Sequence, residues 1–347
     1  MIADASTTPE VLKPTEINVP IYSVERQCPI VVLPLIASGL LLAASAAATA
    51  APSTPPTELH IPGERVVPES LTSSRDGTVY IGSVGTGAIT RVLPGSDTAQ
   101  PWVQPPAGSP QAVFGLFADD RSGTLWACSN TLGKPPESHP GSPSELQAFD
   151  LKTGTPKGRY PLPTDGAFCN DIATGPDGTV YATDTNNMQV LRLTPGATHL
   201  EVWSAEGAFG PKGGAVDGIA VLNHTVYVNT FVTGKIFAVS IGSDGKAGAT
   251  VELKLERTLS NPDGMRTFRD KSLLLVEGGG PGRLSNVALT QGAGTLETLK
   301  EGYPDNPVAV TVIGGKTAYV LEAQWKAMRP DPNYKPKPFH ATAVSLP

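Results

Sequence analysis

The segment Leu259-Ser-Asn-Pro-Asp-Gly-Met265 places an acidic residue, Asp263, at the opening of a predicted β-strand. This strand covers residues 265–268, a turn follows at 269–271, and a second apolar strand covers residues 272–276. Two short apolar strands around a tight polar turn are typical of a β-hairpin. We therefore expect Asp263 at the end of an inner strand, facing a central opening.

The same hairpin recurs along the chain, with a polar residue at its opening in four copies and an apolar one, at residues 114 and 308, in two. A repeat of 45 to 55 residues that contains several strands is typical of a β-propeller, because about four short strands with their turns fill one blade. The sequence therefore predicts an all-β, six-bladed β-propeller with four-stranded antiparallel blades. This repeat length is the spacing between the bulky residues of successive second strands: Tyr80, Trp126, Tyr181, Tyr227, Leu274 and Tyr319.

The ends of the repeat region predict how the ring closes. Residues 57–62 read as a lone strand, and residues 339–346 as the third strand of the last blade. We expect the N-terminal strand to complete that blade, because an open sheet edge invites aggregation. A blade cannot bury both faces without its neighbours, so residues 52–347 are predicted to form a single propeller domain.

Residues 1–51 are predicted to be a signal peptide with an extended N-terminal region. Residues 29–51 are apolar, follow Arg26 and end in small residues such as Ala48 and Ala50. An uncleaved membrane anchor and a buried helix are the alternatives. We expect a periplasmic or secreted protein without a stable membrane span after cleavage.

Charge and cysteine content limit the partners and the compartment. The formal net charge of the chain is −6 and there is no basic run, which argues against a nucleic-acid partner. Cys128 and Cys169 lie toward the same predicted face, where they can form a disulfide or stay two buried free thiols. Nothing in the sequence indicates an oligomeric state.

The polar openings predict a metal site. First strands of a propeller line its axis, so these side chains should converge, and their carboxylates would repel one another unless a cation neutralised them. Oxygen-only ligands favour Ca²⁺, with Mg²⁺, Mn²⁺ or Zn²⁺ as alternatives. Taken singly, each residue could instead satisfy backbone amides in a turn. The predicted ligands are Glu69, Asn170, Asp217 and Asp263.

Polar residues also end the second strands on the same predicted face. They could surround the pocket, orienting ligands or binding a substrate, or they could simply cap the strands. As substrate-binding candidates we take Asn130, Asn229 and Glu277 together with Asn170.

The openings Pro68-Glu69-Ser70, Cys169-Asn170-Asp171, Val216-Asp217-Gly218 and Pro262-Asp263-Gly264-Met265 resemble those of the senescence marker protein (regucalcin), gluconolactonase and lactonase family of six-bladed propellers. The resemblance covers residues 57–347. It implies that Glu69 and Asp263 are metal ligands, that Asp263 is also the general base or nucleophile, and that Asn170 lies on the substrate side. Asp217 stands where the family usually has Asn, which adds one negative charge.

This resemblance implies a metal-dependent hydrolase of lactones or related esters, in which the metal ion polarises the carbonyl and Asp263 activates water. The sequence lacks the G-x-S-x-G and H-E-x-x-H patterns of other hydrolases. The alternatives are a non-catalytic propeller, similar to NHL-repeat modules, that binds a ligand or a protein, and a strictosidine-synthase-like propeller. The predicted partner is a small lactone or ester.

Overall fold

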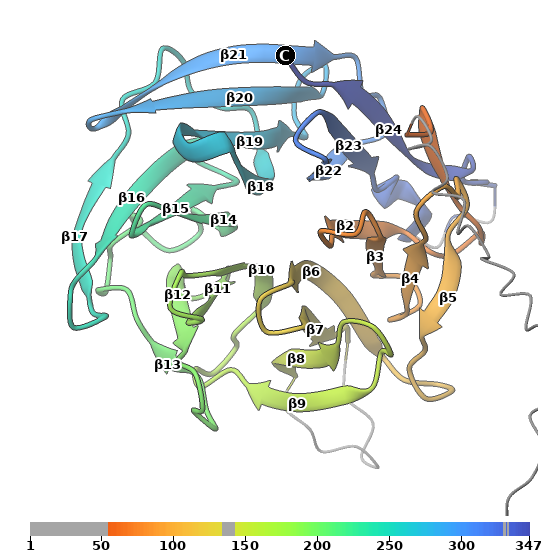
Figure 1. Cartoon of the computed structure of the whole chain (residues 1–347), viewed down its shortest axis with the longest axis horizontal. Helices are drawn as coiled ribbons and strands as arrows, with labels where there is room; N and C mark the ends of the chain where they lie inside the picture. Colours follow the sequence, from red (N-terminus) through yellow and green to blue (C-terminus); the bar gives the residue numbers. More distant parts are fainter. Residues whose placement is uncertain (1–54, 134–142, 329–330, 332) are drawn as a thin grey trace, which may run out of the picture. The chain divides into compact units, whose positions relative to one another are not determined.

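A computed structural model of the chain describes residues 55–133, 143–328, 331 and 333–347. The predicted signal peptide, residues 1–51, lies outside the described residues. The described part forms six four-stranded antiparallel sheets arranged as the blades of a β-propeller (Figure 1). The predicted fold class is therefore confirmed.

Within each of the first five blades the strands follow one another in sequence from the central channel outward (Figure 1). Inner strands are buried along most of their length, whereas the outermost strands alternate or are exposed, as half-exposed strands do. The first three blades consist of β2 (Pro68–Ser73), β3 (Val79–Ser83), β4 (Ile89–Val92) and β5 (Gln100–Val103); β6 (Gln111–Asp119), β7 (Thr124–Thr131), β8 (Ser144–Asp150) and β9 (Pro156–Pro161); and β10 (Cys169–Thr174), β11 (Val180–Asp184), β12 (Gln189–Leu193) and β13 (Glu201–Val202).

The remaining blades repeat this plan, and two short 3-10 helices interrupt the connections of the fifth and sixth. Blade four consists of β14 (Val216–Leu222), β15 (Thr225–Thr230), β16 (Lys235–Ile241) and β17 (Ala247–Glu252); blade five of β18 (Pro262–Phe268), η1 (Arg269–Lys271), β19 (Ser272–Glu277), β20 (Arg283–Thr290) and β21 (Ala293–Glu301); and blade six of β22 (Pro307–Ile313), β23 (Thr317–Glu322), η2 (Trp325–Met328) and β24 (Phe339–Ser345), with β1 (Glu58–Ile61).

The ring closes in blade six, as the sequence predicts. Strand β1 pairs with β24 in antiparallel register, with His60 opposite His340, and the sheet order is β1-β24-β23-β22. Leu59 and Ile61 of β1 are buried in the core cluster that joins the first and last blades. The N-terminal strand therefore supplies the outer strand that β22 to β24 lack.

The core is divided among the blade interfaces. Six clusters of buried apolar side chains occur in the described residues, and each lies between two neighbouring blades. Tyr181 and Tyr319, two of the bulky residues that mark the repeat, are almost completely buried in such clusters. These residues recur because each blade must present a large apolar surface to its neighbour.

A disulfide joins blades two and three. Cys128 of β7 and Cys169 of β10 are bonded, and both are fully buried in the cluster between these blades. Cys169 immediately precedes Asn170, so the bond fixes the backbone beside one of the predicted site residues.

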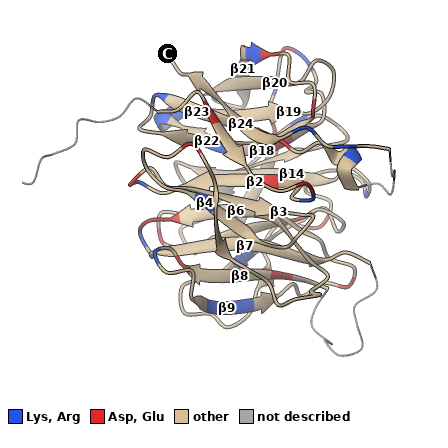
Figure 2. Ribbon diagram, turned by 90° about the vertical axis from the view of Figure 1, so that its right-hand side faces the viewer, with Lys and Arg blue, Asp and Glu red and all other residues tan. Residues whose placement is uncertain are grey.

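The surface is mixed in charge. In the view of Figure 2, Lys and Arg are interspersed with Asp and Glu and form no continuous basic stripe on the side of the described residues that faces the viewer. Within the same residues, no helix has the length and apolar character needed to cross a bilayer. The absence of a nucleic-acid partner stays a prediction.

Candidate functional site

Every inner strand contains a β-bulge where it begins. In β2 the pairing with β3 passes from Pro68 to Ser70, so that Glu69 lies in the bulge. A bulge inserts one unpaired residue and re-aims its side chain. The opening residue of each blade, polar in four and apolar in two, therefore lies at a backbone irregularity of the inner strand. The corresponding shifts in the other inner strands fall between Val113 and Leu116, Cys169 and Ile172, Val216 and Ile219, Pro262 and Met265, and Pro307 and Ala309.

The structure brings all of the predicted metal ligands together. One small pocket is lined by Glu69, Asn170, Asp217 and Asp263, and by an additional carboxylate, Asp171, which sequence reasoning did not single out. Each of these side chains belongs to a residue that is only 4 to 8 % exposed. Four carboxyl groups and one amide thus share a pocket from which water is largely excluded.

Burial changes the acid strength of three of these groups. It raises the pKa of Asp217 to about 8, and the nearby Asp171 adds to the shift, while hydrogen bonds with Asp263 and Asn170 oppose it. Burial likewise raises the pKa of Asp263 well above its usual value, with Asp217 and Glu69 as further causes. The pKa of Glu69 is raised by burial, then by Asp217 and Asp171. Carboxyl groups this close cannot all be ionised without a compensating cation.

The hydrogen bonds leave some carboxyl oxygens free. The backbone N–H of Gly264 donates to Asp263 Oδ1 at 2.9 Å. Asp217 Oδ1 is buried and has no hydrogen-bond partner. An unpartnered buried oxygen is costly and calls for an explanation, such as an ion or a water at that position.

A buried arginine changes the expected charge balance. The sequence predicts that a metal cation neutralises the carboxylates of Glu69, Asp217 and Asp263. Arg266, three residues beyond Asp263 in β18, instead reaches Asp171, with Nη1 2.8 Å from Oδ2 and 3.1 Å from Oδ1. Asp171 was not one of the predicted ligands, so the metal ion expected beside the other three carboxylates stays a prediction, while the fourth carboxylate already has a protein cation as its partner. The signal available in the sequence was a basic residue, Arg266, within the predicted inner strand at residues 265–268.

The residues that end the second strands hold backbone groups. Asn130 donates from Nδ2 to the carbonyl of Cys169 at 2.8 Å and accepts from the Cys169 N–H at 3.2 Å. Asn229 accepts from the Gly218 N–H at 3.1 Å and donates to the Asp263 carbonyl at 2.7 Å. Both side chains therefore fix inner-strand openings on neighbouring blades.

Glu277 plays a similar part in blade five. It is completely buried, receives both terminal nitrogens of Arg257 at 2.7 Å, and accepts from the Ser260 N–H at 2.8 Å. The polar groups of Asn130, Asn229 and Glu277 are thus occupied by protein partners. Of the three roles considered for these residues, the geometry favours holding the strand openings in place, and a contact with a substrate stays a prediction.

The donor chemistry of the pocket fits a hard divalent cation, because all candidate ligands are oxygens, the charge is negative and Asp217 Oδ1 lacks a partner. In the arrangement seen, however, no three His, Cys, Asp or Glu side chains of the described residues are placed so that they could hold a metal ion. Burial raises the pKa of Asp217 to about 8 and that of Asp263 well above its usual value, so a bound ion would have to displace protons from the pocket. The side chains would also have to rotate to bring their oxygens onto one ion.

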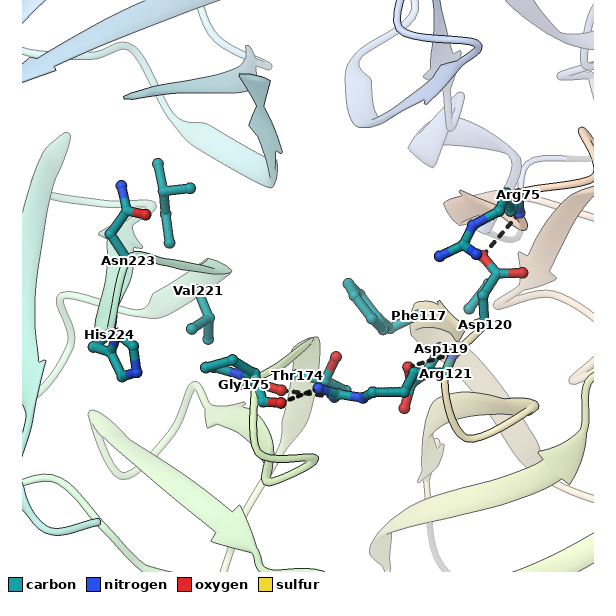
Figure 3. A pocket seen from close by; sticks show the side chains of 13 residues that line it. Arg75, Phe117, Asp119, Asp120, Arg121, Thr174, Gly175, Val221, Asn223 and His224 are labelled. Carbon is teal, nitrogen blue, oxygen red and sulfur yellow. Dashed lines mark hydrogen bonds between the residues drawn. The ribbon is translucent and has the colours of Figure 1, made fainter. Parts of the chain in front are cut away.

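A second pocket lies at the opposite end of the channel, among the hairpin turns of blades one to four (Figure 3). Its wall includes Phe117 and Val221, which also line an inner cavity that reaches Arg266. Arg121 from blade two donates to the carbonyl of Gly175 at 2.7 Å across this mouth. The pair Arg266–Asp171 therefore lies between the acidic pocket and the cavity below it.

No protein-family model matches this sequence, and no curated protein matches it. Solved structures do share its fold. The allergen Mala s 1 of Malassezia sympodialis is 16% identical, with 83% of this chain and 96% of that chain covered and a TM-score of 0.65. A gluconolactonase from Xanthomonas campestris is 15% identical over 83% and 89%, with a TM-score of 0.58. Virginiamycin B lyase from Staphylococcus aureus is 19% identical over 77% and 81%, with a TM-score of 0.56.

These likenesses define the class of the protein as a β-propeller. The presence of gluconolactonases among them is consistent with the resemblance that the blade openings suggest. At such identities the fold is shared, whereas the activity has to be argued from the pocket itself.

Proposed function

We propose that this protein is a Ca²⁺-dependent hydrolase of lactones or related esters, acting in the periplasm or outside the cell. The observation that carries the proposal is the convergence of Glu69, Asp217 and Asp263 with Asn170 in one buried pocket, in which Asp217 Oδ1 has no partner. Glu69, Asp217, Asp263 and Asn170 would hold the ion. Bound Ca²⁺ would supply polarisation of the carbonyl oxygen of the substrate.

Asp263 has the properties of a general base. One of its oxygens accepts the Gly264 N–H, which holds the carboxyl group in place. Its pKa is raised by burial and by the neighbouring carboxylates, so the ionised group is a stronger base than a solvent-exposed aspartate. We infer that Asp263 takes the proton of the attacking water, while Asn170 contributes an amide to orient the ester.

The disulfide supports the proposed compartment. Cys128 and Cys169 are bonded, and such bonds persist mainly in oxidising environments outside the cytoplasm. Asn130, Asn229, Glu277 and Asp171 are all bonded to other protein groups, so the chemistry would depend on the opening residues themselves.

The test measures cation binding and hydrolysis on the same protein. Titration calorimetry of the metal-stripped protein should detect one bound Ca²⁺, and a lactone panel should show Ca²⁺-dependent acid release. Asp263→Asn should keep some metal binding and lose about 10²-fold or more of the rate, since the amide retains an oxygen ligand and loses the base. Asp263→Ala should abolish hydrolysis.

Asp119→Asn is a matched control. Asp119 is as buried as Asp263 but lies at the other end of an inner strand, where it accepts from the N–H of Arg121. This variant should leave binding and rates near the wild-type values. If the wild type neither bound a divalent cation nor hydrolysed any lactone, the non-catalytic binding propeller would replace the enzyme.

A further inference from the structure

Arg266 spans the channel beneath the acidic pocket. It belongs to blade five, yet its Nη2 donates to the carbonyl of Leu116 in blade two at 2.9 Å, and its Nη1 bonds both oxygens of Asp171 in blade three. The guanidinium carbon lies 6.0 Å from the ring centre of Phe117. The side chain is only 11 % exposed. Arg266 is therefore fixed by contacts on two blades on the far side of the channel.

Asp171 has further hydrogen-bond partners besides Arg266. Its Oδ2 also accepts the backbone N–H of Ile219 in blade four at 3.2 Å. Its own N–H donates to Thr183 Oγ1 at 2.9 Å, and the residue is 4 % exposed. All of these contacts are fixed protein groups, which leaves Asp171 little freedom to turn toward a ligand of the pocket.

We propose that Arg266 is a positioning residue that commits Asp171 to the fold and thereby limits the cation site to the three carboxylates of Glu69, Asp217 and Asp263. The inference rests on the proposed function, because it concerns the cation that the pocket would bind. It adds a residue that sets the charge of that site without contacting the ion.

The charge of the cation site depends on how many of its carboxylates already have a protein cation as their partner. Four carboxyl groups line the pocket, and Arg266 is the cation paired with one of them. A fourth free carboxylate would strengthen the attraction for a divalent ion, and would also weaken the polarising power that the ion has left for a carbonyl. Arg266 therefore reduces the negative electrostatic potential of the pocket. An arginine suits this position better than a lysine because its planar guanidinium group bonds Asp171 and the Leu116 carbonyl at the same time.

The same pair also divides the channel. Asp171 lines the acidic pocket, whereas Arg266 lines the cavity on the other side with Phe117 and Val221. A ligand of the acidic pocket therefore enters and leaves by the mouth where the inner strands begin.

Two substitutions with opposite signs test the proposal. Arg266→Met frees Asp171 as a fourth carboxylate, so Ca²⁺ affinity measured by titration calorimetry should rise roughly tenfold. Asp171→Asn leaves an unpaired cation beside Glu69, so affinity should fall by a similar factor. Arg266→Met should also lower the unfolding midpoint of the metal-free protein by roughly 5–10 °C, because a buried charge loses its partner.

A double variant separates charge from packing. In Arg266→Met/Asp171→Asn the buried charges are both absent, so the metal-free midpoint should recover most of the loss and the Ca²⁺ affinity should return to within about threefold of wild type. Lys235→Met serves as the control, because it breaks the exposed pair with Glu252 and should change neither quantity appreciably.

The outcomes decide the two proposals separately. Unchanged affinity in both single variants would overturn the inference, as would a double variant as unstable as Arg266→Met, which would mean that Arg266 acts through Leu116 alone. If the wild type bound no divalent cation, the proposed function would fail. An unfolding midpoint that fell in Arg266→Met and recovered in the double variant would still support the pairing of Asp171 with Arg266. Cation binding that appeared only in Arg266→Met would support the inference and refute the proposed wild-type activity.

Discussion

Gly218 approaches Asp263 so closely that a Cβ on Gly218 would lie 2.3 Å from the Asp263 carbonyl oxygen. The two residues open the inner strands of blades four and five. Asn229 reinforces the contact, since it bonds the N–H of Gly218 and the carbonyl of Asp263. The position of Asp263 in the pocket therefore depends on the absence of a side chain on the neighbouring blade.

We predict that Gly218→Ala displaces the opening of blade five. The new methyl group would overlap a backbone oxygen that cannot move alone, so unfolding free energy should fall by about 1–3 kcal/mol and lactone hydrolysis should fall with it. Gly278→Ala is the control, because a Cβ there would lie 3.4 Å from the nearest atom, the carbonyl oxygen of Pro307. Denaturant titrations and initial rates would measure both effects; equal behaviour of the two variants would contradict the predicted crowding.

We predict that Asp217→Asn weakens Ca²⁺ binding and leaves hydrolysis intact or faster at saturating Ca²⁺. The substitution removes one carboxylate from the ion, which lowers the Coulomb attraction and leaves the ion more able to polarise a carbonyl. Titration calorimetry paired with initial rates on a lactone panel would show both changes. An unchanged affinity would remove Asp217 from the ligand set, and loss of activity at every Ca²⁺ concentration would give it a share of the role assigned to Asp263.

We predict that the metal-free protein loses stability as the pH rises from about 4 to about 8. Burial raises the folded-state pKa of Asp217 from 3.8 to about 8, so the folded protein binds a proton that the unfolded chain releases in this range. The stabilisation is therefore complete below pH 3.8 and is lost as the pH passes through about 8. Thermal unfolding at several pH values would measure it.

Added Ca²⁺ and the Asp217→Asn variant provide two further checks of this pH dependence. Ca²⁺ should restore the unfolding midpoint at pH 8 more than at pH 5, because cation binding requires ionised carboxylates. Asp217→Asn should flatten the pH dependence of the metal-free protein, since the amide does not titrate. A midpoint that rose between pH 5 and pH 8 in the metal-free wild type would be inconsistent with the buried, protonated pocket.

We predict that removal of residues 1–63 destabilises the propeller, whereas removal of residues 1–54 does not. The longer deletion exposes β24 and removes Leu59 and Ile61 from the core, at a cost on the order of 3–6 kcal/mol for the two side chains. It also removes the hydrogen bond that Tyr319 donates to the Pro56 carbonyl at 2.6 Å. Melting curves of the two variants would decide, and coincident midpoints would disprove the stabilising role of β1.

The fold was predictable because its evidence is local and repeated. Each hairpin contributes one bulky residue, which is buried at Tyr181 and Tyr319 and partly buried at Tyr227. The interval between successive bulky residues is about the length of a blade. The lone strand predicted at residues 57–62 similarly indicated the closure, since a strand without a hairpin needs a partner elsewhere in the chain, and the structure pairs residues 58–61 with β24. Repetition thus made weak local signals decisive.

The site was only partly predictable. Openings such as Asp263 follow from the repeat, but contacts across the channel depend on the angle between distant blades, which no local pattern encodes. Arg266 bonds Asp171 although the two residues are 95 positions apart in the sequence. Asp171 was not predicted because its neighbour Asn170 is the predicted opening residue of that blade. The tight packing around Asn229 and Glu277 could not be distinguished from a substrate-binding role without knowing which way their side chains turn.

The repeated bulge has a consequence for how such a protein can change. Each of the six inner strands has its opening residue at a β-bulge, so the backbone provides six equivalent positions around one axis. Four of these positions are occupied by Glu69, Asn170, Asp217 and Asp263, and the other two by Phe114 and Val308. A single substitution at one position can change the chemistry of the central pocket while every blade keeps its hydrogen-bond ladder. Phe114 and Val308 are therefore the positions at which a redesigned propeller could acquire a new polar group with the least disturbance to the carboxylates already in place.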